Sequence, residues 1–162
     1  MTEKDSYQEF LETLPKKRMG AGCLIFDSRG RVLLVKPTYK PVWEIPGGVV
    51  ELNESPKACC QREVIEEIGL AVPIGHLLVM DYNSQSGQKT ESLMFIFDGG
   101  VLGEGEIAKI RLKPDELNEY GFFSRESLPT EMTQSLKNRV LAAWRGKTDG
   151  GAVYLENQIT KQ

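Results

Sequence analysis

Residues that build disulfide frameworks and zinc sites are scarce in this sequence. It has three cysteines and one histidine among 162 residues. Cys59 and Cys60 are adjacent, which makes them a poor disulfide pair, and no Cys or His cluster has zinc-site spacing. This cysteine usage fits a reducing compartment better than a secreted, disulfide-stapled fold. A lone histidine is more often structural than catalytic, so His76 is given no role.

Long apolar segments and an excess of positive charge are also missing. No apolar run reaches the ~18 residues that a membrane span needs. The first residues, MTEKDSYQEF, lack the basic-then-apolar pattern of a signal peptide. The net charge is −3, and no basic tract is interleaved with aromatics. We therefore expect a cytoplasmic protein that does not span a membrane and does not take nucleic acid as its main partner.

What is present suits one globular domain over residues 1–162. The apolar fraction is 40% and the charged fraction 27%, both ordinary for a soluble fold. Residues 1–16 are expected to be a helical lead-in, because Tyr7, Phe10, Leu11 and Leu14 recur at helical spacing and can pack on the domain. Residues 157–162 are expected to be a polar, frayed tail.

Between these ends the pattern alternates strands with two helices. One helix is expected at 56–68 and an amphipathic one at 133–145, with Gly146 as its stop. The expected strands are 19–26, 31–36, 43–45, 72–82, 92–97, 119–124 and 152–155. The fold class is therefore α/β or α+β.

Residues 48–70 organise the chain. Ser55 suits the N-cap of a helix, Pro56 its first position and Gly69 the left-handed residue after its end. On a helical wheel the apolar residues of this segment fall on one side and its charged residues on the other. The charged set is Arg62, Glu63, Glu66 and Glu67.

Three carboxylates thus share one helix face. Glu63 lies at i,i+3 from Glu66 and at i,i+4 from Glu67, spacings at which like charges destabilise a helix by roughly 0.2–0.5 kcal/mol per pair. Glutamates near a helix C-terminus also oppose the helix dipole. A hard divalent cation would remove this conflict, and Mg²⁺ is the usual one for carboxylates that also receive phosphates. The alternative is a solvated acidic face.

The full spacing of the segment resembles the signature of the Nudix hydrolase family, which is G, five residues, E, seven residues, R-E-apolar-x-E-E-x-G-apolar. The matching positions are Gly48, Glu54, Arg62, Glu63, Val64, Glu66, Glu67, Gly69 and Leu70. The resemblance implies an α/β/α sandwich around a mixed β-sheet, that is, an α/β fold with the motif as a loop–helix–loop.

The resemblance also implies an activity, namely hydrolysis of a nucleoside diphosphate linked to another group, with Mg²⁺ as cofactor and Mn²⁺ as a substitute. Glu63, Glu66 and Glu67, with the Gly48 carbonyl, are the implied metal ligands. Arg62 is expected to orient the glutamates or to form a salt bridge to Glu54. Glu54 and Gly69 are expected to support the motif.

The residue that acts as general base varies in such proteins and stays open here. It can be one of the motif glutamates or a distal glutamate that completes the site. Glu119 is the first candidate for the distal glutamate and Glu116 the second, followed by Glu104 and Glu106. The predicted catalytic set is therefore Glu63, Arg62, Glu66 and Glu119.

The substrate is specified outside the motif. Tyr39, Lys40 and Trp43 are candidate substrate-binding residues, since an aromatic beside a cation can hold a base or a phosphate. Packing for Trp43 and solvation for Lys40 are the alternatives. ADP-ribose-cleaving relatives often carry a proline downstream of the motif, and there is none between Pro73 and Pro114. Nucleoside triphosphates and nucleotide sugars stay open.

Two other classes of function remain as alternatives. The first is a catalytically silent, Nudix-like nucleotide sensor, although such domains commonly lose motif acids that are all present here. The second is a non-hydrolytic enzyme such as isopentenyl diphosphate isomerase, which depends on a reactive cysteine. Many relatives are dimers, which is the whole basis for expecting a homodimer.

Overall fold

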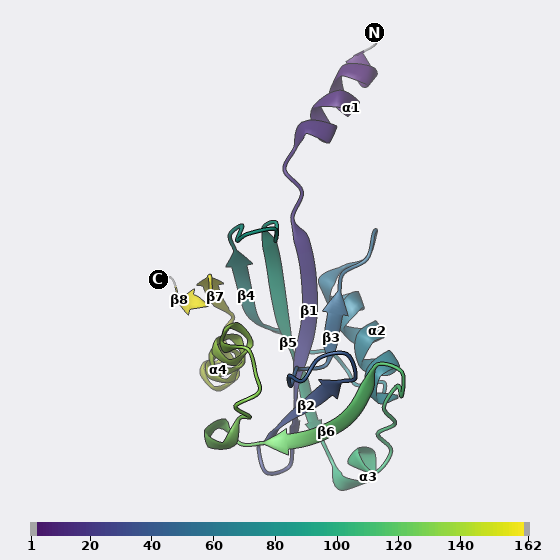
Figure 1. Ribbon diagram of the computed structural model, residues 1–162, viewed down its shortest axis with the longest axis vertical. Coiled ribbons are helices and arrows are strands. Elements are labelled where there is room, and N and C mark those ends of the chain that lie inside the picture. Colours follow the sequence, from purple (N-terminus) through teal and green to yellow (C-terminus); the bar gives the residue numbers. More distant parts are fainter. Residues whose placement is uncertain (1–2, 161–162) are drawn as a thin grey trace.

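A mixed β-sheet forms the centre of the molecule (Figure 1). The computed structural model describes residues 3–160, and within this range the sheet has eight strands in the order β6-β2-β1-β5-β4-β7-β8, with β3 pairing to β1. The strands are β1 (Arg18–Asp27), β2 (Val32–Pro37), β3 (Gly47–Val49), β4 (Leu77–Asn83), β5 (Ser92–Leu102), β6 (Leu117–Phe123), β7 (Val153–Glu156) and β8 (Ile159–Thr160). The helices are α1 (Glu3–Thr13), α2 (Pro56–Ile68), α3 (Glu104–Ile107) and α4 (Gln134–Asp149), with a 3₁₀ turn η1 (Arg125–Ser127).

The sheet is mixed because its two central strands run parallel. β1 pairs with β5 in parallel, whereas β2 and β3 both pair with β1 in the antiparallel sense. β7 is parallel to β4.

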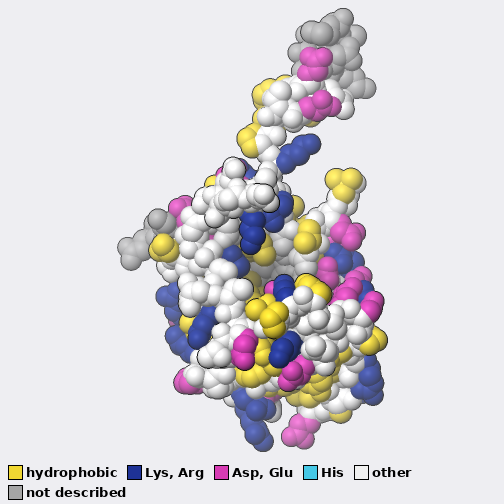
Figure 2. Space-filling model, viewed as in Figure 1, with side chains coloured by type: hydrophobic (Ala, Val, Ile, Leu, Met, Phe, Trp, Pro, Cys, Tyr) yellow, Lys and Arg dark blue, Asp and Glu magenta, His cyan; other side chains and the backbone are white. Residues whose placement is uncertain are grey.

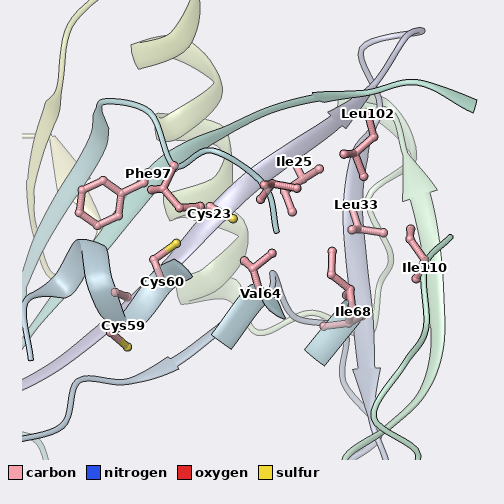
Figure 3. Close-up of a cluster of buried hydrophobic side chains, with 14 of the residues drawn as sticks. Cys23, Ile25, Leu33, Cys59, Cys60, Val64, Ile68, Phe97, Leu102 and Ile110 are labelled. Atoms are coloured by element: carbon pink, nitrogen blue, oxygen red, sulfur yellow. The ribbon is translucent and has the colours of Figure 1, made fainter. Parts of the chain in front are cut away.

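Two helices cover opposite faces of this sheet, so the expected α/β/α sandwich is confirmed (Figure 1). On one face, Cys60, Val64 and Ile68 of α2 point toward Ile25 of β1 and Leu33 of β2 (Figure 3). On the other face the core contains Val140, Ala142 and Ala143 of α4 together with Leu24, Leu34, Leu78 and Leu155 from the sheet.

The predicted ends of α2 are confirmed. Ser55 Oγ accepts a hydrogen bond from the Ala58 N–H at 3.2 Å, and Gly69 closes the helix in the left-handed region with φ 71°. The predicted end of α4 is wrong, because Gly146 lies inside the helix and Gly150 caps it. Gly146 is needed for packing, since a Cβ there would lie 2.9 Å from the Leu78 carbonyl oxygen.

Several other boundaries differ from the sequence expectation. The strand expected at 43–45 is only an isolated bridge between Glu44 and Val35, and the regular strand is β3. Strand β4 begins at Leu77 rather than at residue 72. The tail expected from 157 onward forms a hairpin turn and β8 up to residue 160, while residues 161–162 lie outside the described range.

Helix α1 forms as expected but does not pack on the domain, so that part of the prediction is wrong. Figure 2 shows it standing clear of the body of the molecule with apolar side chains on its surface. Tyr7 is 62% exposed, and Phe10, Leu11 and Leu14 are exposed as well. Among residues 3–160, no helix is long and apolar enough to cross a membrane.

Candidate active site

Arg62 ties the start of the motif to the acidic face of α2. Its Nε and Nη2 donate to the two carboxylate oxygens of Glu54 at 2.8 and 3.0 Å, and its Nη1 donates to Glu63 Oε1 at 2.7 Å. These hydrogen bonds hold the pKa of Glu54 down at about 2. The geometry thus contains both arrangements considered for Arg62, a bridge to Glu54 and a contact that orients Glu63.

Glu67 lies at the junction of α2 and β3. Its Oε2 accepts the Gly47 N–H at 2.9 Å. Burial raises the pKa of Glu67 to about 8, and the negative charges of Glu63, Glu44 and Glu116 act in the same direction. The hydrogen bond from Gly47 opposes this effect only in part. Ionising this half-buried carboxyl among other carboxylates would create a local excess of negative charge.

Gly48 permits the close approach of β3 to this acidic face. A Cβ at position 48 would lie 2.2 Å from Glu63 Oε1, well inside van der Waals contact. The backbone of Gly48 therefore lies directly against the Glu63 carboxylate. The Gly48 carbonyl oxygen itself lies 3.8 Å from Cys59 Sγ, and its role as a metal ligand stays a prediction.

The chemistry of these donors fits a hard divalent cation. Glu63, Glu66 and Glu67 are all on one face of α2, and acidic side chains gather over α2 and the loop before it (Figure 2). Carboxylate and carbonyl oxygens are the ligands that Mg²⁺ prefers. Within residues 3–160, no three His, Cys, Asp or Glu side chains are placed together so as to hold an ion. Arg62 and the Gly47 N–H instead hold Glu63 and Glu67.

A cavity of about 420 Å³ opens beside β3 on the face of the sheet that α4 covers. Tyr39, Lys40, Glu44, Gly47 and Gly48 lie along its wall next to the motif. Other parts of its wall come from β1, β5 and the first turns of α4, namely Arg18, Gly20, Gly22, Ser92, Met94, Thr133, Leu136 and Arg139. The cavity is therefore next to the acidic face and large enough for a small molecule.

Two of the three predicted substrate-binding residues line this cavity. Tyr39 is 74% exposed, and the Lys40 Nζ lies 5.3 Å from its ring centroid and 2.7 Å from Glu44 Oε1. Trp43 does not line it and is only 7% exposed, because its ring packs edge-to-face on Phe123 at 5.0 Å. Of the two alternatives for Trp43, substrate binding and packing, this geometry favours packing.

The identity of the distal glutamate stays a prediction. The carboxylates that act on Glu67 favour candidates other than Glu119, the first one expected from the sequence. Glu119 is 56% exposed on β6, pairs with Lys36 at 3.7 Å and is not among the charges that act most strongly on Glu67. Glu116 and Glu44 are among those charges. Sequence reasoning missed Glu44. In an extended segment, side chains alternate, so Glu44 would point away from its apolar neighbours Trp43 and Ile45.

The alternative of an isomerase requires a reactive cysteine, for which Cys59 is the candidate. The surroundings of Cys59 do not activate its thiol. Burial raises the pKa of Cys59 to about 12, and the carboxylate of Glu54 adds to this effect. Its sulfur lies 3.6 Å from Arg62 Nη2 and 3.8 Å from the Gly48 carbonyl oxygen. The thiol therefore stays protonated and packs under the motif.

Comparison with known proteins identifies a family. The family model of the NUDIX domain matches residues 16–144. A MutT-like protein of Streptomyces ambofaciens is 35% identical over 101 residues, covering 61% of this chain and 65% of that protein. Diphosphoinositol polyphosphate phosphohydrolase 2 of Rattus norvegicus is 37% identical over 76 residues, covering 46% of this chain and 42% of that protein.

A solved structure agrees with the fold. The crystal structure of a UDP-X diphosphatase superposes with a TM-score of 0.72 at 20% identity, covering 96% of this chain and 76% of that one. The chain spans less than two thirds of the length of the two curated relatives named above.

Proposed function

This chain belongs to the Nudix hydrolase family, and we propose that it is a divalent-cation-dependent pyrophosphohydrolase. Its substrate is a nucleoside diphosphate joined to another group, and the bond cleaved is a phosphoanhydride. The observation that carries the proposal is a small-molecule cavity whose wall includes Gly47 and Gly48, which lie directly against Glu67 and Glu63 of the motif. A diphosphate and that acidic face repel each other unless a cation lies between them.

Glu63, Glu66 and Glu67, with the Gly48 carbonyl, would hold the cation, which is Mg²⁺ with Mn²⁺ as a substitute. The cation supplies charge neutralisation and orientation of the diphosphate. Arg62 keeps the Glu63 carboxylate in place through its 2.7 Å hydrogen bond. Tyr39 and Lys40, on the wall of the cavity, contact the substrate beside the motif.

In the reaction, a water oxygen attacks one phosphorus of the diphosphate and the bond from that phosphorus to its bridging oxygen breaks. The proton of the water goes to a carboxylate of the site. Glu63 and Glu66 in the motif, and Glu44 and Glu116 beside Glu67, are the candidates for this base. The two products are phosphate monoesters or one monoester and a polyphosphate.

A product screen tests this proposal. The protein is incubated with Mg²⁺ and, separately, nucleoside triphosphates, nucleotide sugars, ADP-ribose, dinucleoside polyphosphates and a diphosphorylated inositol phosphate. The products are identified by mass. We expect cleavage inside a diphosphate by the wild type, a loss of at least about a hundredfold in Glu67→Gln, and no loss in Glu9→Gln, whose carboxylate is exposed on α1.

Two outcomes would contradict the proposal. Cleavage that survives Glu67→Gln would remove Glu67 from the metal site. Binding of a nucleotide with no product after long incubation in Mg²⁺ or Mn²⁺ would instead support a nucleotide sensor.

A further inference from the structure

Arg139 of α4 lines the part of the cavity wall that lies over β4. From β3, beside the motif, the sheet runs through β1 and β5 to β4. Three spacings between neighbouring strands amount to roughly 14 Å. Arg139 Nε donates to Asp81 on β4 at 2.6 Å, so its guanidinium lies across the sheet from the acidic face. A group bound there would lie at the opposite end of the cavity from the motif.

The guanidinium of Arg139 is fixed in position. Its Nη2 donates to Asn83 Oδ1 at 2.9 Å, in addition to the bond from Nε to Asp81. The side chain is only 12% exposed. Its third nitrogen, Nη1, has no hydrogen bond to any residue within 3–160. One whole nitrogen of a rigid, cavity-lining group is thus left to donate to a ligand.

The C-terminal hairpin holds the two acceptors that orient Arg139. The Gln158 backbone N–H donates to Asp81 Oδ1 at 3.0 Å, and its side-chain amide donates to both Asp81 Oδ2 and Asn83 Oδ1. Asp81 is fully buried. The hairpin follows residue 144, where the match to the family ends.

Gln158 adopts a backbone conformation that favours glycine. Its φ is +64°, next to Asn157 with φ +51°, in the two-residue turn between β7 and β8. Such turns normally take glycine at the second position. A strained residue persists only where its surroundings hold it, and such strain is common at ligand sites. Here the side chain of Gln158 makes the contacts that glycine would lose.

The balance of charge around Arg139 indicates the kind of group it binds. Its positive charge is compensated by the buried carboxylate of Asp81, so it has little net attraction for a second anion. The neighbouring wall is apolar, with Met94 and Leu136, and the floor at Gly20 and Gly22 carries no side chains. A flat ring with a carbonyl acceptor on its edge fits an apolar wall beside a fixed hydrogen-bond donor whose charge is already compensated.

We propose that Arg139 is a specificity-determining residue that donates from Nη1 to a carbonyl oxygen of the nucleobase, and that Gln158 is the positioning residue that fixes it. The inference rests on the proposed function, since it names how the same site recognises the nucleoside part of its substrate.

Equilibrium binding separates this inference from the reaction itself. The probes are ADP, GDP, CDP and UDP in Mg²⁺, titrated calorimetrically into the wild type and three variants. Arg139→Lys keeps the positive charge beside Asp81 but loses the planar fork. Gln158→Gly removes the positioning side chain and relieves the left-handed backbone, while the backbone N–H still reaches Asp81. Arg145→Lys is the control, because Arg145 is on the same helix and donates to Thr160 without lining the cavity.

We expect the wild type to prefer a base with a carbonyl edge, and Arg139→Lys to weaken that complex by about tenfold or more and to reduce the preference. Gln158→Gly should also weaken the complex, with no fall in melting temperature. If Gln158 only stabilised the fold, the variant would instead lower the melting temperature. Arg145→Lys should match the wild type. Where a substrate is turned over, the effect of Arg139→Lys should fall on KM, with kcat within about twofold.

The inference is overturned if the wild type binds none of the four probes, if it binds all four equally, or if Arg139→Lys discriminates as the wild type does. Loss of discrimination in Arg139→Lys, without hydrolysis of any substrate, would support the inference and contradict the proposed function. Hydrolysis of a nucleoside diphosphate derivative with an unchanged KM and an unchanged base preference in Arg139→Lys would support the proposed function and contradict the inference.

Discussion

Burial and three neighbouring carboxylates all raise the pKa of Glu67. The pKa of this carboxyl is raised to about 8, whereas its ordinary value is 4.5. The folded protein without a cation therefore keeps a proton on Glu67 over a pH range in which the unfolded chain has lost it. Ionising this carboxyl in the folded protein is unfavourable. A bound cation would offset that cost by stabilising the ionised form.

Stability should consequently depend on pH through Glu67. Between about pH 5 and pH 8 the native state binds more protons than the unfolded state, so the free energy of unfolding falls as pH rises through this window, by on the order of a few kcal/mol. Urea denaturation in a chelator at several pH values measures this fall. Glu67→Gln should lack this component, and Mg²⁺ should reduce it at the alkaline end. An equal slope in the variant would contradict the assignment.

Gly48 gives a second prediction at the scale of one residue. Gly48→Ala places a Cβ 2.2 Å from Glu63 Oε1, so the carboxylate must move away from β3. We expect kcat to fall by about tenfold to a hundredfold, because a displaced ligand disturbs the geometry of the site. Gly105→Ala is the matched control, since its Cβ meets nothing within 4 Å. Wild-type turnover in Gly48→Ala would show that Glu63 is not required in this position.

At the scale of elements, the features that could be predicted from the sequence are those that neighbouring residues along the chain determine. The caps of α2 and the spacing of its acids are local, and the structure confirms both the helix and its ends. Strand β3 could not be predicted from periodicity, because it forms through a close approach of glycines, with Gly47 opposite Gly22 and Gly48 opposite Ala21. The environment of Glu67 includes Glu44 and Glu116, which are remote in sequence from the motif, and no pattern reveals that.

Helix α1 provides a test at the same scale. Its apolar side chains are exposed and do not pack on the sheet or on α2 and α4. We expect deletion of residues 1–14 to leave the melting temperature within about 2 °C of the full chain and kcat unchanged. Calorimetry and the hydrolysis assay measure these. A clear loss of either would mean that α1 packs against something in solution.

At the scale of the whole molecule, an acidic protein is proposed to bind a polyanion. The net charge is −3, and two of the motif glutamates, Glu63 and Glu67, contact Gly48 and Gly47 of the cavity wall. Arg18, which has no carboxylate within 4.0 Å in residues 3–160, and Lys40 supply positive charge on the cavity wall. These two cations do not outweigh the acids next to the reacting phosphates. The account therefore needs the cation for binding as well as for chemistry.

The central claim is that water attacks a phosphorus of a diphosphate and that this requires the motif acids and a divalent cation. The most direct test is a reaction in ¹⁸O-labelled water with the best substrate from the screen, followed by mass spectrometry of both products. We predict one labelled oxygen in one phosphate product, no product in a chelator, and recovery of activity with Mg²⁺ or Mn²⁺. Products without the label, or full activity in the chelator, would contradict the account.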